Sequence, residues 1–297
     1  MHFPSTLTAL IALLPLTNAF YKGMNIGANN EDGSCKTTAQ WTEAFTRLKN
    51  TPQHITSVRL YASSDCNTLA SAVPAALSTG TQILAGVWAA DENHYAAENA
   101  ALKQAIQTHG HDWLLAISVG SEDLYRAQIN SGIALEPSIL AARINATRTM
   151  VRDLKVEVQV GHVDTWTAWI NATNEAVITA SEFIGLDAYP YFQNVSLADA
   201  YSTFWDAVDV TRKQVNAVSP GKWVWITETG WPVSGTYHTQ DHAIPSVANA
   251  QHYWRSVACE AFKDVHVFWY AYQDYNSNPS FGMFDRNGKA IYDLYAC

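Results

Sequence analysis

The chain has 297 residues, of which 48% are hydrophobic and 15% are charged, and its formal net charge is −9. A chain of this length and apolar content can bury one large core or two modest ones. It has no cluster of Lys and Arg, which argues against nucleic acid and anionic membranes as partners. The 11 Trp and 14 Tyr residues can fill a core, and their flat faces also suit stacking on sugar rings.

The first segment of the chain has the pattern of a secretory signal peptide. Within residues 1–19, an apolar run spans residues 7–16, and the segment ends in the small residue Ala19. Its amino-terminal part carries His2 where such peptides usually carry Lys or Arg. The run is too short for a membrane span, which needs about 20 apolar residues. We therefore expect a secreted, soluble protein whose folded domain comprises residues 20–297.

Four cysteines fit an oxidising compartment. They are Cys35, Cys66, Cys259 and Cys297. Their spacing is not that of a metal site, and four cysteines allow three pairings. The first two follow early strand candidates and the other two lie late in the chain, which favours the pairs 35–66 and 259–297. The sequons at Asn145, Asn171 and Asn194 predict N-glycosylation in a eukaryotic secretory pathway.

Strand and helix patterns alternate from end to end. The strand candidates are short apolar runs, as in parallel strands that are covered on both faces. They are residues 21–25, 57–61, 82–88, 114–120, 156–163, 183–189, 223–227 and 266–272. Helical patterns occupy residues 38–50, 68–78, 94–109, 138–154, 174–180, 197–217 and 247–262.

This alternation matches a single (β/α)8 TIM barrel, for which about 250 residues are typical. A doubly wound open sheet is the alternative. Such a sheet normally shows a glycine-rich phosphate loop after an early strand, and residues 23–27 lack the GxGxxG pattern.

Two strand candidates end in a glutamate. Residues 222–232 read K-W-V-W-I-T-E-T-G-W-P, with Glu228 at the strand end, and residues 114–122 read L-L-A-I-S-V-G-S-E, ending at Glu122. In a (β/α)8 barrel the active site gathers at the carboxyl ends of the strands, so both acids would face one pocket. Paired carboxylates perform glycoside hydrolysis, with retention at a separation of about 5–5.5 Å and inversion at about 6.5–9.5 Å. Partial burial and a nearby carboxylate would keep the acid of the pair protonated.

Four motifs together resemble glycoside hydrolase family 17, and in particular its fungal cell-wall β-1,3-glucanase/glucanosyltransferase branch. They are T-E-T-G-W-P at 227–232, V-G-S-E-D-L-Y-R at 119–126, V-R-L-Y at 58–61 and D-A-Y-P-Y-F at 187–192. The resemblance covers essentially all of residues 20–297. It implies a (β/α)8 barrel, β-1,3-glucan as substrate, retention of configuration and no cofactor. Carried over by position, Glu228 is the nucleophile and Glu122 the acid/base.

Further residues near the strand ends are candidates for contacts with the sugar. Tyr189 would either hydrogen-bond the nucleophile or pack at the barrel mouth, and Asp187 would contact substrate or serve as a structural acid. Trp231 would stack on a sugar or pack beneath its loop. Many family members have Asn where this chain has Ser121, and serine is usual in the fungal branch. The full set is Tyr61, Asp65, Ser121, Tyr125, Asp187, Tyr189 and Trp231.

The leading hypothesis is a secreted, monomeric enzyme of the cell wall that cuts β-1,3-glucan internally. It would pass the fragment to another glucan or hydrolyse it, and the resemblance favours transfer. A non-catalytic glucan-binding wall protein and a retaining barrel acting on β-1,4-linked polysaccharide are the alternatives. The ten histidines show no HExxH or paired ligand spacing, which argues against a metal site. The G-S-E sequence at 120–122 lacks the G-x-S-x-G elbow of an esterase.

Overall fold

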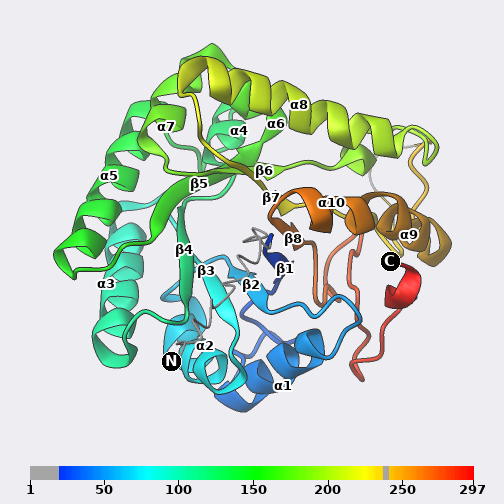
Figure 1. The fold of residues 1–297 in the computed structure, drawn as a ribbon, viewed down its shortest axis with the longest axis horizontal. Coiled ribbons are helices and arrows are strands. Elements are labelled where there is room, and N and C mark those ends of the chain that lie inside the picture. The colour runs from blue at the N-terminus through cyan, green and yellow to red at the C-terminus, as the bar shows by residue number, and fades with distance from the viewer. Residues whose placement is uncertain (1–19, 237–240) are drawn as a thin grey trace, which may run out of the picture.

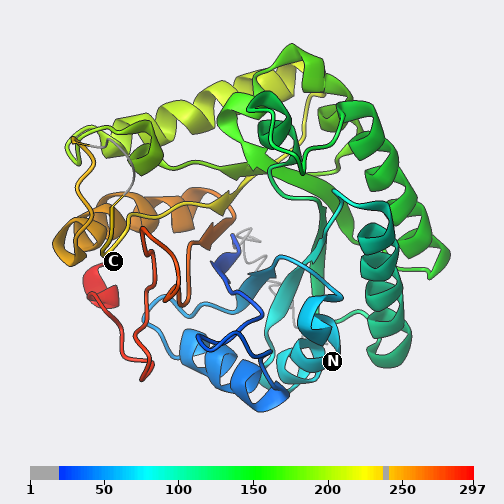
Figure 2. The ribbon, with the colours of Figure 1, turned by 180° about the vertical axis from the view of Figure 1, so that it is seen from behind.

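Eight parallel strands pair in chain order and close into a barrel, with β1 joined to β8 (Figure 1). The computed structural model describes residues 20–236 and 241–297, so the predicted signal peptide, residues 1–19, lies outside the described residues. Helices surround the strands in both views of the molecule (Figures 1 and 2). The (β/α)8 barrel predicted from the sequence is confirmed.

All eight predicted strands are present, and every one pairs with two neighbours. The strands are β1 (Lys22–Asn25), β2 (Ser57–Leu60), β3 (Gln82–Val87), β4 (Leu114–Val119), β5 (Gln159–Thr165), β6 (Ile184–Asp187), β7 (Val224–Glu228) and β8 (Val267–Trp269). The helices are α1 (Thr38–Lys49), α2 (Thr68–Thr79), α3 (Glu92–His109), α4 (Asp123–Gln128), α5 (Pro137–Asp153), α6 (Trp166–Trp169), α7 (Glu175–Ala180), α8 (Ala200–Val218), α9 (Val247–Tyr253) and α10 (Cys259–Asp264). Shorter helical turns include η1 (Asp65–Asn67), η2 (Ala172–Asn174), η3 (Pro190–Gln193) and η4 (Trp254–Ala258).

The differences from the predicted elements are local. β5 begins at Gln159, later than predicted, after the chain has left α5 through Lys155 with a positive φ of 64°. The sequence did not reveal α4 and α6, which have 6 and 4 residues, too few for a helical period to be visible. The predicted helix over 247–262 consists of α9, η4 and α10 in succession.

Hydrophobic burial explains why these residues form a barrel. The strands β2, β4, β6 and β7 are buried at every position, as expected for strands between a barrel interior and a helical layer. On α1, Trp41, Phe45 and Leu48 recur at helical spacing and are all buried. A smaller cluster made of residues in or beside the strands fills the barrel interior, where Trp225 stacks on Phe183 at 4.5 Å.

Two disulfides join distant segments. Cys35 is bonded to Cys66, which ties the loop after β1 to the loop after β2, and Cys259 at the start of α10 is bonded to Cys297. These are the two pairings that the sequence favoured. Within residues 20–236 and 241–297, none of the helices has the length and apolar character that crossing a membrane requires.

The three predicted glycosylation sites differ in their surroundings. Asn145 is exposed on α5, where its Oδ1 accepts a hydrogen bond from Arg148. Asn171 caps η2, and its Oδ1 accepts from the backbone N–H and hydroxyl of Thr173. The amide of Asn194 is hydrogen-bonded to Asp241 and to the backbone beyond it. Asn145 is therefore the most accessible of the three side chains.

Candidate active site

The site lies at the carboxyl ends of the strands, where β6 and β7 bring two acids side by side. The register between these strands shifts at Leu186/Asp187, and the shift places Asp187 opposite Glu228. Such irregularities re-aim side chains at the rims of barrels. Glu228 is the last residue of β7 and is only 8% exposed.

Three donors hold the Glu228 carboxylate. Its Oε1 accepts from Nη1 of Arg59 at 2.5 Å and from the hydroxyl of Tyr61 at 2.9 Å. Its Oε2 accepts from the hydroxyl of Tyr189 at 2.7 Å. Hydrogen bonds of this kind to a charged acceptor are short and favour the ionised form. The arrangement fixes the orientation of this carboxylate at the barrel mouth, which suits a nucleophile.

The cation beneath Glu228 is itself held by buried polar groups. Arg59 is 1% exposed, and its Nη1 also donates to Oδ1 of Asn25 at 3.1 Å. Its Nη2 donates to Oγ of Ser121 at 3.0 Å, which links β2 to the loop after β4. Asn25 is oriented in turn by donating to the backbone carbonyls of Thr227 and Phe268, both at 2.9 Å. The guanidinium is therefore fully enclosed and cannot swing away from the carboxylate.

The second carboxyl group, that of Glu122, lies in surroundings that favour its neutral form. Burial, followed by the charges of Glu228 and Asp164, raises the pKa of Glu122 to about 8, whereas Arg126 and Arg59 oppose the shift. At neutral pH Glu122 therefore carries a proton that it can donate. The two acids thus lie in different surroundings, because three donors hold the carboxylate of Glu228 whereas burial favours the proton on Glu122.

Glu122 stands on a loop with an unusual backbone. Gly120 has a φ of 75° and Glu122 a φ of 57°, both in the left-handed region. A Cβ atom at Gly120 would lie 2.1 Å from Oδ2 of Asp123 and 3.2 Å from Cε1 of His162. The Asp123 oxygen accepts the Ser121 N–H at 2.9 Å, so it is fixed in that place. Glycine is therefore required at position 120 by both conformation and space.

Tyr189 and Asp187, both predicted on β6 and its loop, take different parts. Tyr189 bonds the nucleophile, as one of its two predicted roles required. Asp187 is 2% exposed, and its Oδ1 accepts from the Thr227 hydroxyl at 2.8 Å. Burial, followed by the Glu228 charge, raises the pKa of Asp187 well above its ordinary value. Asp187 is thus a buried structural acid that presents little surface to a sugar.

Trp231 does not lie where a sugar could stack on it, and of its two predicted roles it takes the second, packing beneath its loop. It is 2% exposed, and its Nε1 donates to the carbonyl of Ile244 at 2.9 Å. Its ring packs against Tyr191 and Tyr253, at centroid distances of 5.5 and 5.7 Å. The loop after β7 folds over this side chain, which therefore serves packing.

Ser121 and Tyr125 both lie beside Glu122. The Ser121 hydroxyl is occupied by the Arg59 guanidinium, and only 9% of the residue is exposed. Tyr125 is half-buried on α4, and its N–H donates to Asp164. Ser121 therefore acts chiefly as a link between the two catalytic candidates.

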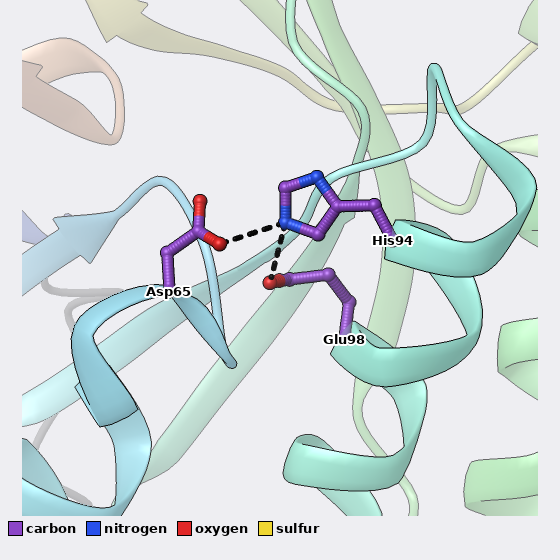
Figure 3. A group of neighbouring side chains, drawn as sticks. All are labelled: Asp65, His94 and Glu98. Carbon is purple, nitrogen blue, oxygen red and sulfur yellow. Dashed lines mark hydrogen bonds and ion pairs between the residues drawn. The ribbon is translucent and has the colours of Figure 1, made fainter.

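Asp65 lies in a separate group with His94 and Glu98 (Figure 3). His94 Nε2 lies 2.8 Å from Oδ1 of Asp65 and 3.3 Å from Oε1 of Glu98. The Glu98 oxygens also accept the backbone N–H groups of Ser63 and Ser64 and the Ser64 hydroxyl. Because these donors already occupy the Glu98 carboxylate, the group suits holding the loop after β2 better than binding a cation. Within the described residues, Asp65 makes no hydrogen bond to Glu228 or to the side chains that donate to Glu228.

An aromatic wall adjoins the nucleophile, and it includes Tyr270 and Phe281, which the sequence did not single out. Tyr270 follows β8 and is half-buried, with its ring centroid 5.9 Å from that of Tyr189. Phe281 packs 5.5 Å from both rings. Phe192 lies 5.3 Å from Tyr189 and remains 43% exposed. These flat side chains border the site on the side of β6 and β8.

A polar cavity of about 830 Å³ opens at the same end of the barrel, over β1 and β8. Ile26 and Gly27 follow β1, and Tyr272 and Gln273 follow β8. Amide, carboxylate and tyrosine side chains dominate its wall. They include Asn29, Asn30, Glu31, Gln273, Asp274 and Tyr275. This chemistry suits a ligand rich in hydroxyl groups.

Three comparisons relate the chain to known proteins. A model of the BtgE/BtgC glycoside hydrolase domain matches residues 23–285. The chain is 42% identical to a protein of Aspergillus fumigatus named probable glucan endo-1,3-beta-glucosidase, over 93% of this chain and 65% of that protein. It is 33% identical to the glucan 1,3-beta-glucosidase of Saccharomyces cerevisiae, over 87% of this chain and 84% of that protein. The chain therefore spans less than two thirds of the Aspergillus relative.

A solved structure supports the same relationship. The glycoside hydrolase family 17 β-1,3-glucanosyltransferase of Rhizomucor miehei is 28% identical, with a TM-score of 0.76 over 93% of this chain and 98% of that one. An active-site mutant of this Rhizomucor enzyme has been solved with laminaritriose.

Proposed function

The chain belongs to the family of the BtgE/BtgC glycoside hydrolase domain, as the sequence resemblance predicted, and on that premise we propose that it is a retaining enzyme that cleaves β-1,3-glucan. The observation that carries the proposal is the contrast between its two acids. Glu228 accepts three hydrogen bonds, one from a buried guanidinium, while burial raises the pKa of Glu122 to about 8.

In the proposed first step, a carboxylate oxygen of Glu228 attacks the anomeric carbon of the sugar. The bond from that carbon to the glycosidic oxygen breaks, and Glu122 gives its proton to the departing oxygen. In the second step, the Glu122 carboxylate takes a proton from an incoming hydroxyl group, whose oxygen attacks the anomeric carbon and releases Glu228. The incoming group is water in hydrolysis and a sugar hydroxyl in transfer. Each of the two steps inverts the configuration at the anomeric carbon, so the configuration is retained overall.

The β-1,3 linkage rests on the relatives, which are named for activity on 1,3-β-glucan. The barrel and the glutamate pair alone would equally serve a β-1,4-linked polysaccharide. The polar cavity over β1 and β8 supports a substrate that extends beyond one sugar, because it opens at the same barrel end as Glu228. A panel of β-1,3-, β-1,4- and mixed-linkage glucans separates these substrates.

Transfer to a second glucan is the part of the proposal that the aromatic wall supports. An acceptor sugar on the leaving-group side must exclude water from the glycosyl-enzyme. Phe192, which is 43% exposed, and Tyr270 beside Tyr189 offer apolar faces against which such a sugar can stack. Relatives are named as hydrolases and as a transferase, so product lengths must decide.

Secretion, a cell-wall location, the monomeric state and glycosylation complete the proposal. The two disulfides fit an oxidising compartment. The exposed Asn145 is the sequon we expect to carry a glycan. Mass spectrometry of protein secreted from a eukaryotic host, with and without glycosidase treatment, tests this assignment.

The decisive experiment incubates the protein with reduced laminari-oligosaccharides and resolves product lengths. Products longer than the donor indicate transfer, and only shorter ones indicate hydrolysis. Glu228→Gln should abolish turnover and keep oligosaccharide binding, whereas Glu157→Gln, whose side chain is 80% exposed, should leave activity unchanged. Binding without any turnover by the unmodified protein would favour the non-catalytic alternative. Full activity of Glu228→Gln would refute the nucleophile assignment.

A further inference from the structure

A buried histidine and a buried aspartate on β5 take no part in the proposed mechanism. His162 and Asp164 are both 0% exposed, and Nε2 of His162 lies 2.9 Å from Oδ2 of Asp164. Both face the loop that carries Glu122, because the Glu122 N–H donates to the carbonyl of Val163 between them at 2.8 Å. Burying two polar groups of this kind is costly unless each is paired.

The neighbours of the imidazole fix its protons. Nδ1 of His162 lies 2.7 Å from the backbone carbonyl of Val119, which can only accept, so Nδ1 must carry a hydrogen. Nε2 faces Oδ2 of Asp164, which already accepts the Leu124 N–H at 2.9 Å. A second proton must therefore lie between Nε2 and Oδ2. His162 and Asp164 together therefore hold one proton more than a neutral imidazole and an ionised carboxylate would hold.

This locked carboxylate caps the helix that Glu122 begins. Oδ2 of Asp164 accepts from Leu124, and Oδ1 accepts from Tyr125 at 3.2 Å and from Thr165 at 2.9 Å. Leu124 and Tyr125 are in the first turn of α4, whose N–H groups the residue at the N-cap normally satisfies. Glu122 occupies that N-cap position but makes no side-chain cap. Asp164 performs the capping instead and leaves the Glu122 carboxyl free for the substrate.

We propose that Asp164, held by the proton it shares with His162, is the positioning residue that aims Glu122 at the glycosidic oxygen. The assignment rests on the proposed role of Glu122 as acid/base. An Asn at position 164 can supply an acceptor at only one of the two oxygen positions. It would therefore leave an N–H group of α4, or His162 itself, opposed by another donor.

The charged groups around Glu122 come from several elements. The pKa of Glu122 therefore offers a test of the proposed role of Asp164. Glu122 faces Glu228 of β7, Asp164 of β5, Arg126 of α4 and Arg59 of β2. It also interacts with Asp187 of β6 and with Tyr270 after β8. Removing the Asp164 charge should lower the pKa of Glu122. Removing His162 leaves the Asp164 charge without its partner and should raise it.

The first test compares donors with natural and activated leaving groups. Asp164→Asn should lower kcat/KM for reduced laminari-oligosaccharides by about ten-fold or more, because their leaving group needs a well-placed acid. It should lower kcat/KM for an aryl laminaribioside with an acidic phenol by less than about three-fold. Trp169→Phe, which alters the indole packed on His162 at 5.6 Å, serves as the structural control. Trp169→Phe should lower kcat/KM for the two donors by the same factor. If Asp164→Asn also lowered kcat/KM for the two donors by the same factor, the proposal would be overturned.

The second test uses the alkaline limb of the kcat/KM profile. Asp164→Asn should move it to lower pH, and His162→Phe, which keeps an aromatic ring against Trp169, should move it to higher pH. Opposite movements cannot arise from loosened packing alone. Movements in one direction, or none, would contradict the assignment.

The third test does not depend on activity. NMR spectra of the unmodified protein near neutral pH should show two exchange-protected protons on the hydrogen bonds of the His162 ring, one at Nδ1 and one between Nε2 and Oδ2. A single proton would refute the shared-proton arrangement. If the unmodified protein left laminari-oligosaccharides and the aryl glycoside intact, that result would instead refute the proposed function. Failure of the inference about Asp164 and failure of the proposed function are therefore distinguishable.

Discussion

Replacing Arg59 with methionine removes the cation beneath the proposed nucleophile and keeps a similar volume. The side chains of Arg59 and Glu228 are 2% and 11% exposed, and their charged atoms are 2.5 Å apart. Arg59→Met leaves Glu228 with two tyrosine hydroxyls and with Asp187 and Glu122 nearby. The Glu228 carboxylate then loses the buried positive charge that lies 2.5 Å from it.

The magnitude follows from burial. Unit charges about 4 Å apart attract by roughly 4 kcal/mol at an effective dielectric constant of 20. Breaking a buried pair by removing one partner costs about 3–5 kcal/mol. For a domain of this size, about 2–4 °C of Tm is lost per kcal/mol, so the Tm should fall by on the order of 10 °C. The kcat/KM for glucan should fall by at least about 10³-fold, because Glu228 loses the cation that holds and orients its carboxylate.

Thermal unfolding at neutral pH, together with oligosaccharide turnover, measures these effects. Arg59→Lys keeps the charge without the forked geometry and should be intermediate. Arg212→Met breaks an exposed pair, in which Arg212 and Asp209 are 42% and 73% exposed, and should cost about 0.5 kcal/mol or less. If Arg59→Met were as stable and active as Arg212→Met, the reasoning about Glu228 would be wrong.

Three further outcomes are expected. The kcat/KM for unactivated oligosaccharides should decline as the pH rises through about 8, where Glu122 loses its proton, and a pH-rate profile without that limb would contradict its role as acid. Gly120→Ala should lower the free energy of unfolding by about 1–3 kcal/mol, measured in urea, because its φ is 75° and its Cβ would meet Asp123. Replacing Cys259 and Cys297 by serine should cost about 2–4 kcal/mol and leave kcat/KM nearly unchanged, and a large loss of kcat/KM would show that this disulfide also shapes the site.

The barrel and the two glutamates could be predicted because their signals are local. A buried parallel strand is a short apolar run, and Glu228 and Glu122 stand where two such runs stop. The short helix α4 left no period to detect, although it begins directly after Glu122.

The network that controls the acids could not be predicted, because its contacts join residues far apart in the sequence. Arg59 and Glu228 are 169 positions apart, and Asn25 reaches the backbone carbonyls of β7 and β8. One signal was available: Arg59 stands inside an apolar strand, where an unpaired charge is costly. The sequence left two roles open for Trp231, since only the fold of its loop decides whether an aromatic ring is covered.

The central claim is that Glu228 forms a covalent bond to a glucan fragment, and a trapping experiment tests it directly. A 2-deoxy-2-fluoro-laminaribiosyl fluoride should form the glycosyl-enzyme and release it slowly. Intact mass spectrometry should then show one added fluorinated disaccharide, and peptide mapping should place it on Glu228. A label on Glu122 or another residue, or rapid turnover of β-1,3-glucan without any label, would contradict the account.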